Sequence, residues 1–357
     1  MSSPPIRVLH VNAGREWRGG QNQTRLLVRE LAAFSSVSTT LITRRHSELA
    51  ARVRRDAPGI ELREVPWGPA VDLRALWEMR RALIEVRPAI VHAHEAHALR
   101  LALWARRLAG LASLRVIATR RVDFHARFGS AWFRADLIIA ISQAVRGILI
   151  GDGVPAERIR VVASGIDPGE VRRAAARPLD IRGRLGLAPT APLAVHVAAL
   201  VAHKDQQTLV RAAAAARTLA PDLHWVVAGE GEFRARLEAQ IARLGLRDHV
   251  HLLGYVRESD ALIAEGNVFV MSSKEEGLGT VVLHALALGK PVVATRGGGI
   301  PEMLPSESLV PIGDADALAR KVASVLAFPQ ADASLLPSQF TARSMAHGVL
   351  AVYQSVV

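Results

Sequence analysis

The sequence predicts an α/β protein with two domains, each a parallel β-sheet covered by helices. Strand-like apolar runs alternate with helix-like amphipathic runs along nearly all of its 357 residues. That length exceeds one ordinary core and suits two domains of about 150 residues each. Because helices separate the strands, we expect parallel pairing with right-handed crossovers.

In the first half, strands and helices are predicted in alternation. The predicted strands are short apolar runs, typical of a buried sheet, over 6–12, 39–43, 60–66, 89–94, 115–119, 136–142 and 158–164. Apolar residues at the helical period predict the connecting helices over 21–34, 46–55, 72–86 and 96–108.

Residues 165–192 interrupt this alternation. They are rich in Gly, Pro and Arg and have no sustained apolar period, so we expect them to contain the linker. The pattern then resumes with strands over 193–200, 224–230, 250–255, 268–273, 291–295 and 308–313 and helices over 205–219, 232–243, 258–264, 279–288 and 314–327. We predict two Rossmann-like domains, 1–167 and 168–336, facing a central cleft. A last helix within 337–357 is expected to pack back on the first domain.

The net charge of +12 lies entirely in the first half. Residues 1–165 contain 26 arginines, no lysine and 14 acidic residues, whereas residues 166–357 contain 19 basic and 19 acidic residues. This asymmetry indicates an anionic partner: lipid, nucleic acid or a phosphorylated substrate. The alternative is a set of solvated arginine-rich helix faces.

The composition excludes several classes of protein. Without cysteine the chain has no disulfide, zinc–thiolate site or thiol nucleophile. Apolar runs such as 136–142 are far shorter than the roughly 20 residues that cross a bilayer. The first residues lack the features of a secretory signal. We therefore expect a cytoplasmic protein.

The most informative stretch is "EEGLGTVVLHALALGKPVVATRGGGIPE", residues 275–302. The preceding strand ends at 272–273, and parallel sheets bind ligands at the carboxyl ends of their strands, so the glutamates at 275–276 are expected in the cleft. Glycines within 277–279 precede a helix, whose first N–H groups and dipole favour an anion such as phosphate. A second glycine turn follows at 296–302. The alternative is that both are ordinary strand-to-helix loops.

This stretch resembles the signature of retaining GT-B glycosyltransferases of family 4. That signature has a Glu-Gly pair, two glutamates separated by seven residues, a Lys-Pro strand and Gly-Gly-x-Pro-Glu. Further segments resemble, in the same order, the family's N-terminal glycine loop, its segments before the linker, its phosphate loop and its nucleotide-binding half: 14–23, 138–145, 158–167, 198–205 and 226–256.

The resemblance implies three groups of site residues. Glu276 lies against the donor sugar, and Asp123 and His125 are further catalytic candidates. The donor-binding candidates are Gly19, Gly20, Lys204, Gly229, Gly254, Tyr255, Gly277, Leu278, Gly279, Thr280 and His284. The acceptor-binding candidates are His94, Arg120 and Arg121, which suit an anionic acceptor. Backbone amides of the glycines and the Lys204 ammonium would stabilise a departing diphosphate without a metal or other cofactor.

The sequence departs from the family pattern at two positions. His284 stands where the second glutamate, which resembles a ribose-hydroxyl acceptor, is expected; a neutral imidazole accepts one hydrogen bond, not two. Ala199 stands where the phosphate loop has an arginine, while Lys204 is present. His203 and Arg296 are the candidates for the missing positive charge.

Two acidic or histidine-rich patterns invite a metal interpretation, which we do not favour. "DAD" (314–316) precedes a predicted helix, where Asp is a common N-cap. In "VHAHEAH" (91–97), His92 and His94 share one face of a strand while Glu95 lies on the other, which favours histidines lining a cleft. Glu302 is expected either to contact the donor pocket or to cap the following turn.

Five of the six tryptophans lie in the basic half, at positions 17, 67, 77, 104 and 132. Aromatic rings beside arginines suit the headgroup layer of an anionic membrane, which predicts peripheral attachment involving 120–134. The alternative is core tryptophans with solvated arginines.

We therefore predict a retaining, metal-independent glycosyltransferase. It would move a sugar from a nucleotide-diphosphate donor to a cell-envelope glycolipid or polysaccharide acceptor. The alternative is a catalytically degenerate protein that binds a nucleotide sugar or glycan without turnover. Nucleic-acid binding is disfavoured because no RNA-binding signature is present, and an NAD enzyme is disfavoured because "NAGREWRGG" breaks the G-x-G-x-x-G spacing.

Overall fold

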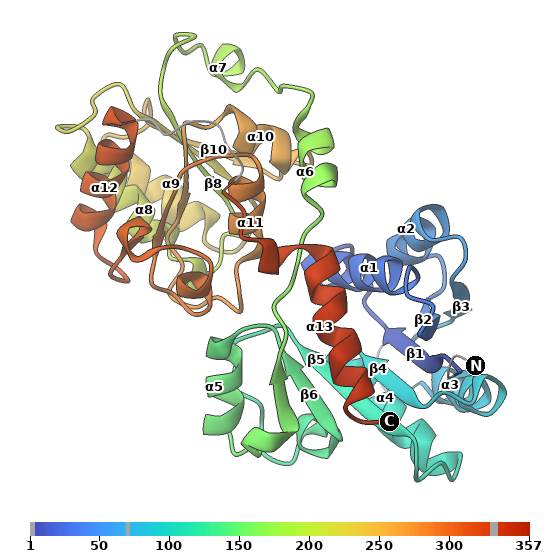
Figure 1. The fold of residues 1–357 in the computed structure, drawn as a ribbon. Helices are drawn as coiled ribbons and strands as arrows, with labels where there is room; N and C mark the ends of the chain where they lie inside the picture. The colour runs from blue at the N-terminus through green and yellow to red at the C-terminus, as the bar shows by residue number, and fades with distance from the viewer. Residues whose placement is uncertain (1–3, 69–71, 329–334) are drawn as a thin grey trace. The chain divides into compact units, whose positions relative to one another are not determined.

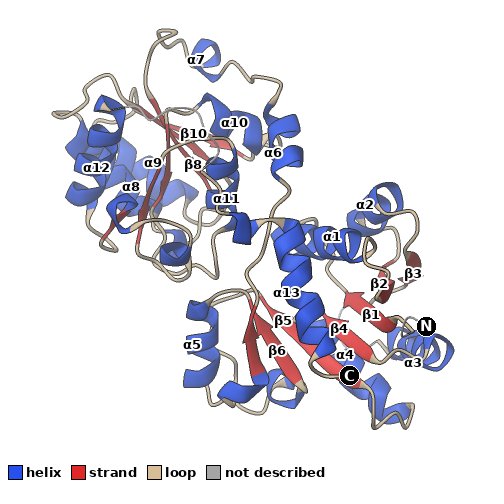
Figure 2. Cartoon of the chain, in the orientation of Figure 1, coloured by secondary structure: helices blue, strands red, loops and turns tan. Residues whose placement is uncertain are grey.

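The computed structural model describes residues 4–68, 72–328 and 335–357 (Figure 1). The chain divides into unit 1, residues 1–165 with 339–357, and unit 2, residues 166–338. Each unit has one wholly parallel sheet with helices on its faces (Figure 2). This confirms the predicted fold class of two Rossmann-like sheets.

The sheet of unit 1 has seven strands in the order β3-β2-β1-β4-β5-β6-β7. Strand β1 pairs on both sides, with Val8 opposite Thr39 on β2 and Ile90 on β4. The strands are β1 (Ile6–Asn12), β2 (Val37–Arg44), β3 (Glu61–Val65), β4 (Ile90–Ala93), β5 (Arg115–Arg120), β6 (Leu137–Ala140) and β7 (Ile159–Val161). Their order reverses between β1 and β4, the kind of position at which open α/β sheets bind ligands.

The helices of unit 1 begin at polar side chains that bond the free backbone N–H groups of the first turn. Ser47, Asp72, Glu95 and Ser142 cap four of them in this way. The helices are α1 (Gly19–Leu31), α2 (Glu48–Asp56), α3 (Leu73–Val86), α4 (Ala96–Leu108), α5 (Gln143–Gly151) and α13 (Ala342–Gln354), with 3₁₀ turns η1 (Ala131–Arg134) and η2 (Ala156–Arg158).

Helix α13 comes from the far end of the chain yet belongs to unit 1, where it packs against α1 (Figure 1). Thr341 caps it, and its apolar residues recur at helical spacing. Met345, Val349 and Tyr353 are buried in one core cluster with Leu27 of α1. Unit 1 is thus completed by a segment that follows unit 2 in the sequence.

Unit 2 has a six-stranded sheet in the order β10-β9-β8-β11-β12-β13. Its core includes Trp225 and Leu209, both buried. The strands are β8 (Leu193–Val197), β9 (His224–Ala228), β10 (Val250–Gly254), β11 (Val268–Met271), β12 (Val292–Thr295) and β13 (Leu309–Val310). The helices are α6 (Pro168–Ala175), α7 (Ile181–Arg184), α8 (Gln206–Ala216), α9 (Arg234–Arg243), α10 (Ser259–Glu265), α11 (Thr280–Ala287) and α12 (Ala315–Ala327), with 3₁₀ turns η3 (Ala202–Lys204), η4 (Ile300–Glu302), η5 (Ser306–Ser308) and η6 (Ser338–Phe340).

Residues 165–192, expected to contain the linker, include the boundary between the two units and two short helices. The unit boundary falls between Gly165 and Ile166, and the segment beyond it folds as α6 and α7. Asp167 caps α6 and Pro168 is its first residue, which is a favourable helix start. Helix α5 was also not predicted.

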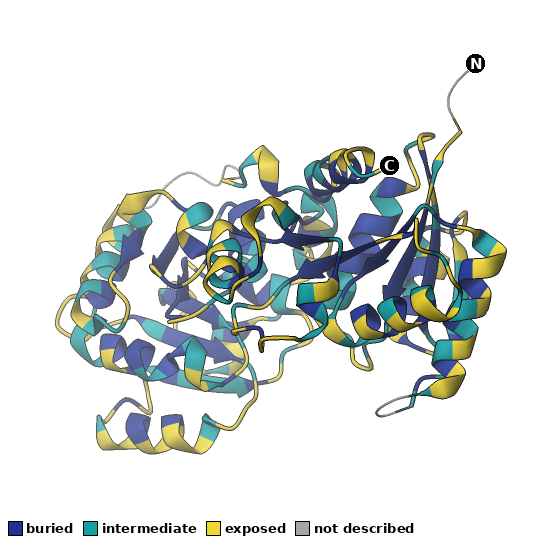
Figure 3. Cartoon of the chain, turned by 90° about the horizontal axis from the view of Figure 1, so that it is seen from below, coloured by how far each residue is buried: buried dark blue, intermediate teal, exposed yellow. Residues whose placement is uncertain are grey.

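Burial follows the layered arrangement. Figure 3 shows the strands mostly buried, whereas exposed residues lie on the helices and loops. Among the described residues, no helix combines the length and apolar character that a bilayer crossing requires.

Candidate functional site

In unit 2, the loops at the carboxyl ends of neighbouring strands are bonded to one another. After β8, the backbone N–H of Leu200 donates to the carbonyl of Glu230, which follows β9 (2.9 Å). The backbone N–H of Lys274, which follows β11, donates to the carbonyl of His203 (2.8 Å). The loops after β8, β9 and β11 therefore form one connected surface at this edge of the sheet.

Glu276 and Lys204 form an ion pair on that surface. Lys204 Nζ contacts Glu276 Oε2, which also accepts a hydrogen bond from Ser273 Oγ (3.2 Å). The side chains of Lys204 and Glu276 are 16% and 13% exposed, respectively. The backbone N–H of Gly299, after β12, donates to the Glu276 carbonyl (2.8 Å). Contacts from the loops after β8, β11 and β12 thus fix Glu276.

Helix α11 begins directly beside this ion pair. Its N-cap, Gly279, has φ = 83°, a left-handed conformation that favours glycine. A Cβ at Gly279 would lie 3.0 Å from Glu276 Cγ. The first turn, starting at Thr280, contains no acidic residue, and Leu278 is buried beneath it. The helix dipole and the first N–H groups favour an anion at this position.

Gly229, Gly254 and Tyr255 lie on the adjoining loops after β9 and β10. Gly229 (φ = 146°) approaches Ala198 so closely that a Cβ would overlap the Ala198 carbonyl, and its N–H donates to the carbonyl of Gly254 (2.8 Å). Tyr255 is exposed. The structure thus brings these three predicted residues to the same sheet edge as Lys204.

The two departures from the family pattern have different surroundings. The side chain of His284 bonds Asp260 on α10, with Nδ1 2.7 Å from the carboxylate Oδ1. Ala199 is exposed in the loop after β8, where its carbonyl accepts from Gln206 Nε2 (2.9 Å). Arg296, one candidate for the missing charge, donates weakly to the Ser306 carbonyl (3.4 Å).

Unit 1 brings a second set of predicted residues together at the carboxyl ends of β1, β4 and β5. Gly19 and Gly20 are the first residues of α1, and a Cβ on Gly20 would lie 3.9 Å from Arg121 Cδ. Arg121 Nη1 donates to the carbonyl of His94 (3.1 Å). Burial lowers the pKa of Arg121 to about 10, which still leaves it charged at neutral pH. Its Nε is buried with no hydrogen-bond partner among the described residues.

The end of β5 and the segment after it hold the remaining predicted residues of unit 1, which are Arg120, Asp123 and His125. Arg120 is buried over the ring of Trp132, 4.8 Å from its centroid, and donates to the Phe124 carbonyl. Asp123 has one buried carboxylate oxygen, Oδ2, without a partner among the described residues. His125 is exposed, and its Nδ1 lies 2.6 Å from Asp152 Oδ1.

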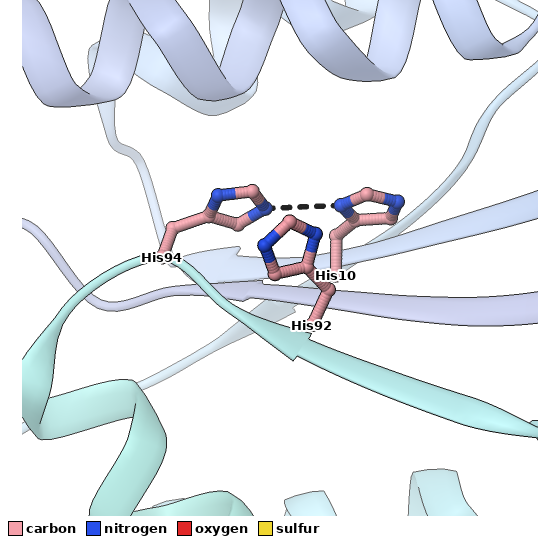
Figure 4. A group of neighbouring side chains, drawn as sticks. All are labelled: His10, His92 and His94. Carbon is pink, nitrogen blue, oxygen red and sulfur yellow. Dashed lines mark hydrogen bonds between the residues drawn. The ribbon is translucent and has the colours of Figure 1, made fainter. Parts of the chain in front are cut away.

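Three buried histidines lie beneath this edge of unit 1 (Figure 4). His10 Nδ1 is 2.9 Å from His94 Nε2, while the two nitrogens of His92 bond Tyr353 and Thr119 at 2.6 Å each. Burial lowers the pKa of His10 to about 3 and the pKa values of the other two well below their usual range, so all three are neutral.

These histidines form the one group within the described ranges whose side chains are close enough to hold a metal. Their candidate ligand atoms lie within 4.8 Å of one another. Two nitrogen ligands of a tetrahedral zinc ion lie roughly 3.4 Å from each other. His10 Nδ1 and His94 Nε2 are closer than this, at 2.9 Å, and both nitrogens of His92 are hydrogen-bonded. The three rings take part in a hydrogen-bonded network that includes Tyr353 and Thr119. In unit 2, Asp314 caps α12 through the N–H of Ala317 (2.8 Å), as predicted.

The aromatic residues of the basic half divide into two groups. Trp67 and Trp132 are buried, so the alternative of core tryptophans applies to them. The guanidinium carbon of Arg52 lies over the ring of Trp17, 4.2 Å from the ring centroid. Trp77 and Trp104 are 62% and 58% exposed, on helices α3 and α4 that contact each other.

Three partners of the predicted site residues were missed in the sequence. They are Ser273, Asp260 and Asp152, which bond Glu276, His284 and His125 respectively. Asp260 and Asp152 lie 24 and 27 positions from their partners, so no local pattern joins them.

Two doubly wound parallel sheets in one chain, the second with a glycine-lined carboxyl edge, define a GT-B protein. Residues 17–170 match the family model described as Glycosyltransferase Family 4, and residues 179–336 match Glycosyl transferases group 1. Because the two models together match most of the chain, this protein belongs to glycosyltransferase family 4.

Individual relatives agree with this assignment. The amylovoran biosynthesis glycosyltransferase AmsK of Erwinia amylovora is 30% identical over 224 residues, which is 58% of this chain and 51% of AmsK. A GDP-mannose-dependent α-(1-6)-phosphatidylinositol monomannoside mannosyltransferase of Mycolicibacterium smegmatis is 30% identical over 213 residues, 56% of each chain. The chain thus spans about half the length of these relatives. The crystal structure of Anabaena HepE with UDP shares the fold, with a TM-score of 0.79 and 20% identity over 98% of this chain and 100% of HepE.

Proposed function

We propose that this protein transfers a sugar, with retention of configuration, from a nucleotide-diphosphate donor to a cell-envelope glycolipid or polysaccharide. The observation that carries the proposal is the Lys204–Glu276 pair beside the first turn of α11. A cation and a helix N-terminus suit a diphosphate, and an adjacent carboxylate suits sugar hydroxyls. The names of relatives that act on or bind GDP-mannose and UDP support a nucleotide donor.

The proposed roles follow from the charge that develops during transfer. As the bond between the sugar and the diphosphate breaks, negative charge grows on the leaving phosphate and positive charge grows on the sugar. Lys204 and the amides of Gly279 and Thr280 would stabilise the first, and Glu276 would orient the sugar and stabilise the second. The acceptor oxygen forms the new bond, and its proton leaves with the diphosphate.

In unit 1, the positive charge of Arg121 is proposed to bind an anionic group of the donor or the acceptor. Arg121 is a charged side chain beside the start of α1, and in the part of the chain that the structure describes no carboxylate pairs with it. A buried cation without a counter-ion is costly, which favours binding of an anion such as a phosphate of the donor or acceptor. Asp123 and His125 stay proposed as catalytic residues.

A thermal-shift screen with UDP-, GDP- and ADP-sugars tests donor binding first. Specific binding raises the apparent melting temperature by mass action. One nucleotide class should stabilise the protein, and the same donor should then be consumed with a sugar acceptor. If no nucleotide sugar binds, the proposal is wrong. If one binds without hydrolysis or transfer, the chain is the catalytically degenerate binder.

Glu276→Ala tests the catalytic role, and Glu275→Ala is its matched control. Glu275 is the exposed neighbouring carboxylate, whereas Glu276 contacts Lys204. We expect Glu276→Ala to abolish transfer while circular dichroism remains that of the folded protein, and Glu275→Ala to keep nearly full activity. Equal activity of the two variants would contradict the assignment.

The proposed reaction uses no metal or other cofactor. In unit 2 the charge opposite the phosphate comes from Lys204 and backbone amides. Transfer rates should be unchanged by EDTA, and proton NMR of the first product should show the anomeric configuration of the donor. Activity restored only by a divalent cation would contradict metal independence, and an inverted product would contradict retention.

We further propose that unit 1 attaches to an anionic membrane through the outer face of α3 and α4. Exposed apolar side chains on this face are Leu73, Trp77, Ile84, Trp104 and Leu108. Arginines accompany them on the same helices, and Arg80 lies over Trp77. Two copies of this positive face would repel each other, whereas anionic headgroups attract it.

Sedimentation with phosphatidylcholine vesicles, with or without phosphatidylglycerol, tests this attachment. We expect binding only to anionic vesicles, a clear loss with Trp77→Ser/Trp104→Ser, and a loss with charge reversal at the exposed arginines within 120–134, Arg127 and Arg134. Tyr255→Ser, which removes an exposed aromatic ring from the half of the chain that has no net charge, is the control and should bind normally. Unchanged vesicle binding in the double variant would contradict the surface.

A further inference from the structure

The structure pairs His284 with a carboxylate that no local sequence pattern associates with it. His284 Nδ1 lies 2.7 Å from Asp260 Oδ1, between the contacting helices α11 and α10. Their side chains are 24% and 15% exposed, so the bond is largely shielded from solvent. A shielded bond to a carboxylate holds an imidazole ring in one orientation.

This bond determines which nitrogen of the neutral ring carries the proton. An ionised carboxylate only accepts hydrogen bonds, so Nδ1 must donate its hydrogen to Asp260. In the neutral ring, Nε2 then presents a lone pair. Nε2 has no hydrogen-bond partner among the described residues and is not sealed from solvent. His284 therefore offers one outward hydrogen-bond acceptor.

The position of this acceptor is set by α11. Thr280 and His284 are four residues apart, on one face of the helix. Both are partly accessible, whereas Val282, Leu283 and Ala285 are buried. The accessible face thus runs from the first turn, beside Glu276, to His284 one turn further along.

We propose that Asp260 is a positioning residue for donor binding, acting through His284. It holds the ring with Nδ1 protonated, so that Nε2 accepts a hydrogen bond from a ribose hydroxyl of the donor nucleotide. This inference rests on the proposed donor site around Glu276. A glutamate at position 284 could by itself accept hydrogen bonds from two hydroxyls. The pair of Asp260 and His284 supplies one acceptor, Nε2, and therefore bonds one hydroxyl.

A double-mutant cycle with His284→Ala tests the coupling. The dissociation constants of UDP and GDP are measured by calorimetry for the wild type, Asp260→Ala, His284→Ala and the double variant. We expect Asp260→Ala to weaken nucleotide binding about tenfold, the contribution of one such hydrogen bond. In the His284→Ala background, which has no ring to position, the same change should have little effect. Glu258→Ala, an exposed carboxylate at the start of α10, is the matched control and should bind normally.

Deoxynucleotides and steady-state kinetics separate positioning from a structural role. Because one ribose hydroxyl is proposed to bond Nε2, one of the two nucleotides, the 2′-deoxy or the 3′-deoxy diphosphate, lacks this bond. With that nucleotide, Asp260→Ala should cause no further loss of affinity. With the sugar donor, Asp260→Ala should raise KM and leave kcat unchanged. Equal losses with all nucleotides, or in both the wild-type and the His284→Ala backgrounds, would show that Asp260 only holds α10 against α11 and would overturn the proposal.

Nitrogen NMR of the His284 ring gives a test that needs no ligand. We expect Nδ1 to be protonated in the wild type and the Nε2–H form to appear in Asp260→Ala. An Nε2–H ring in the wild type would overturn the inference even if nucleotide binds. The expected tautomer without binding of any nucleoside diphosphate would instead show that the proposed function is wrong, and the ribose contact with it.

Discussion

Lys204 and Glu276 are the residues on which the account of the site depends. They lie in different loops, Lys204 after β8 and Glu276 after β11, and neither is expected to make the ion pair from its local sequence. The motif predicted Glu276, and the loop pattern predicted Lys204, but their direct contact required the fold. Ser273, which completes the contacts to Glu276, carries no signal that separates it from any serine at a strand end.

Lys204→Ala should weaken donor binding because it removes the ammonium group that contacts Glu276. We expect KM for the nucleotide sugar to rise at least tenfold, since a charge-assisted hydrogen bond contributes about 1.5–3 kcal/mol. The measurement is steady-state kinetics with calorimetry of the nucleoside diphosphate. Lys274→Ala, whose Nζ lies 3.4 Å from Asp205, is the control. Equal affinity of wild type and Lys204→Ala would contradict the role of Lys204.

Ala199→Arg should strengthen the same interaction. Ala199 is exposed in the loop after β8, so an arginine can be accommodated there without disturbing the core. If this loop binds phosphate, the added guanidinium should lower the dissociation constant of UDP or GDP about tenfold. The same substitution at exposed Ala188, away from this loop, should have no effect. A weaker or unchanged affinity in Ala199→Arg would mean that the phosphate lies elsewhere.

At the scale of elements, the alternating pattern predicted the two sheets because strands buried on both faces have a strong apolar signal. Helices α5 and α6 were missed for different reasons. Helix α5 follows β6 with almost no intervening turn, and its apolar residues extend the strand's run. Helix α6 is short and rich in arginine, so its period is weak, although Asp167 and Pro168 mark its start. Tertiary contacts, which local patterns do not contain, stabilise such helices.

The glycine turn after β12 offers a prediction at this scale. A Cβ on Gly298 would overlap the carbonyl oxygen of Glu276, and its φ of 51° is left-handed. Gly298→Ala should therefore displace Glu276 and abolish most transfer. Gly313→Ala is the matched control, because Gly313 has φ = 78° but no atom within 4 Å of a Cβ.

For Gly313→Ala we expect only the backbone cost of about 1–2 kcal/mol in the free energy of unfolding, with activity retained. Urea unfolding measures the first effect and transfer assays the second. If both alanine variants kept activity, close packing of the glycine turn on Glu276 would be unnecessary for function.

At the scale of the whole molecule, buried histidines should make stability depend on pH. The pKa of His10 in unit 1 is lowered to about 3 by burial, and that of His196 in unit 2 is lowered to about 4 mainly by burial. In the unfolded chain both groups titrate near 6.5. Between these values the unfolded state binds more protons, so stability is complete above about pH 6.5 and falls as the pH decreases.

Each such histidine should contribute a slope of about 1.4 kcal/mol per pH unit within this window. Urea unfolding at a series of pH values from 7.5 to 5 measures the slope. His10→Gln, which keeps a polar side chain but does not titrate, should flatten it. An unchanged slope in that variant would contradict the buried, neutral state of His10.

The division into units also belongs to this scale. Alternation and length predicted two α/β parts, and a last helix, set off by a polar stretch, was expected to return to the first part. Helix α13 packs against α1, and its residue Tyr353 is fully buried with its hydroxyl bonded to His92 of β4. The sequence held no local sign of this bond, which joins residues 261 positions apart.

A crystal structure with the nucleotide sugar selected by the thermal-shift screen tests the central claim most directly. The account predicts a diphosphate bonded by Lys204 and by the backbone amides at the start of α11, with the sugar against Glu276. A diphosphate bound anywhere other than at these groups of unit 2 would contradict it.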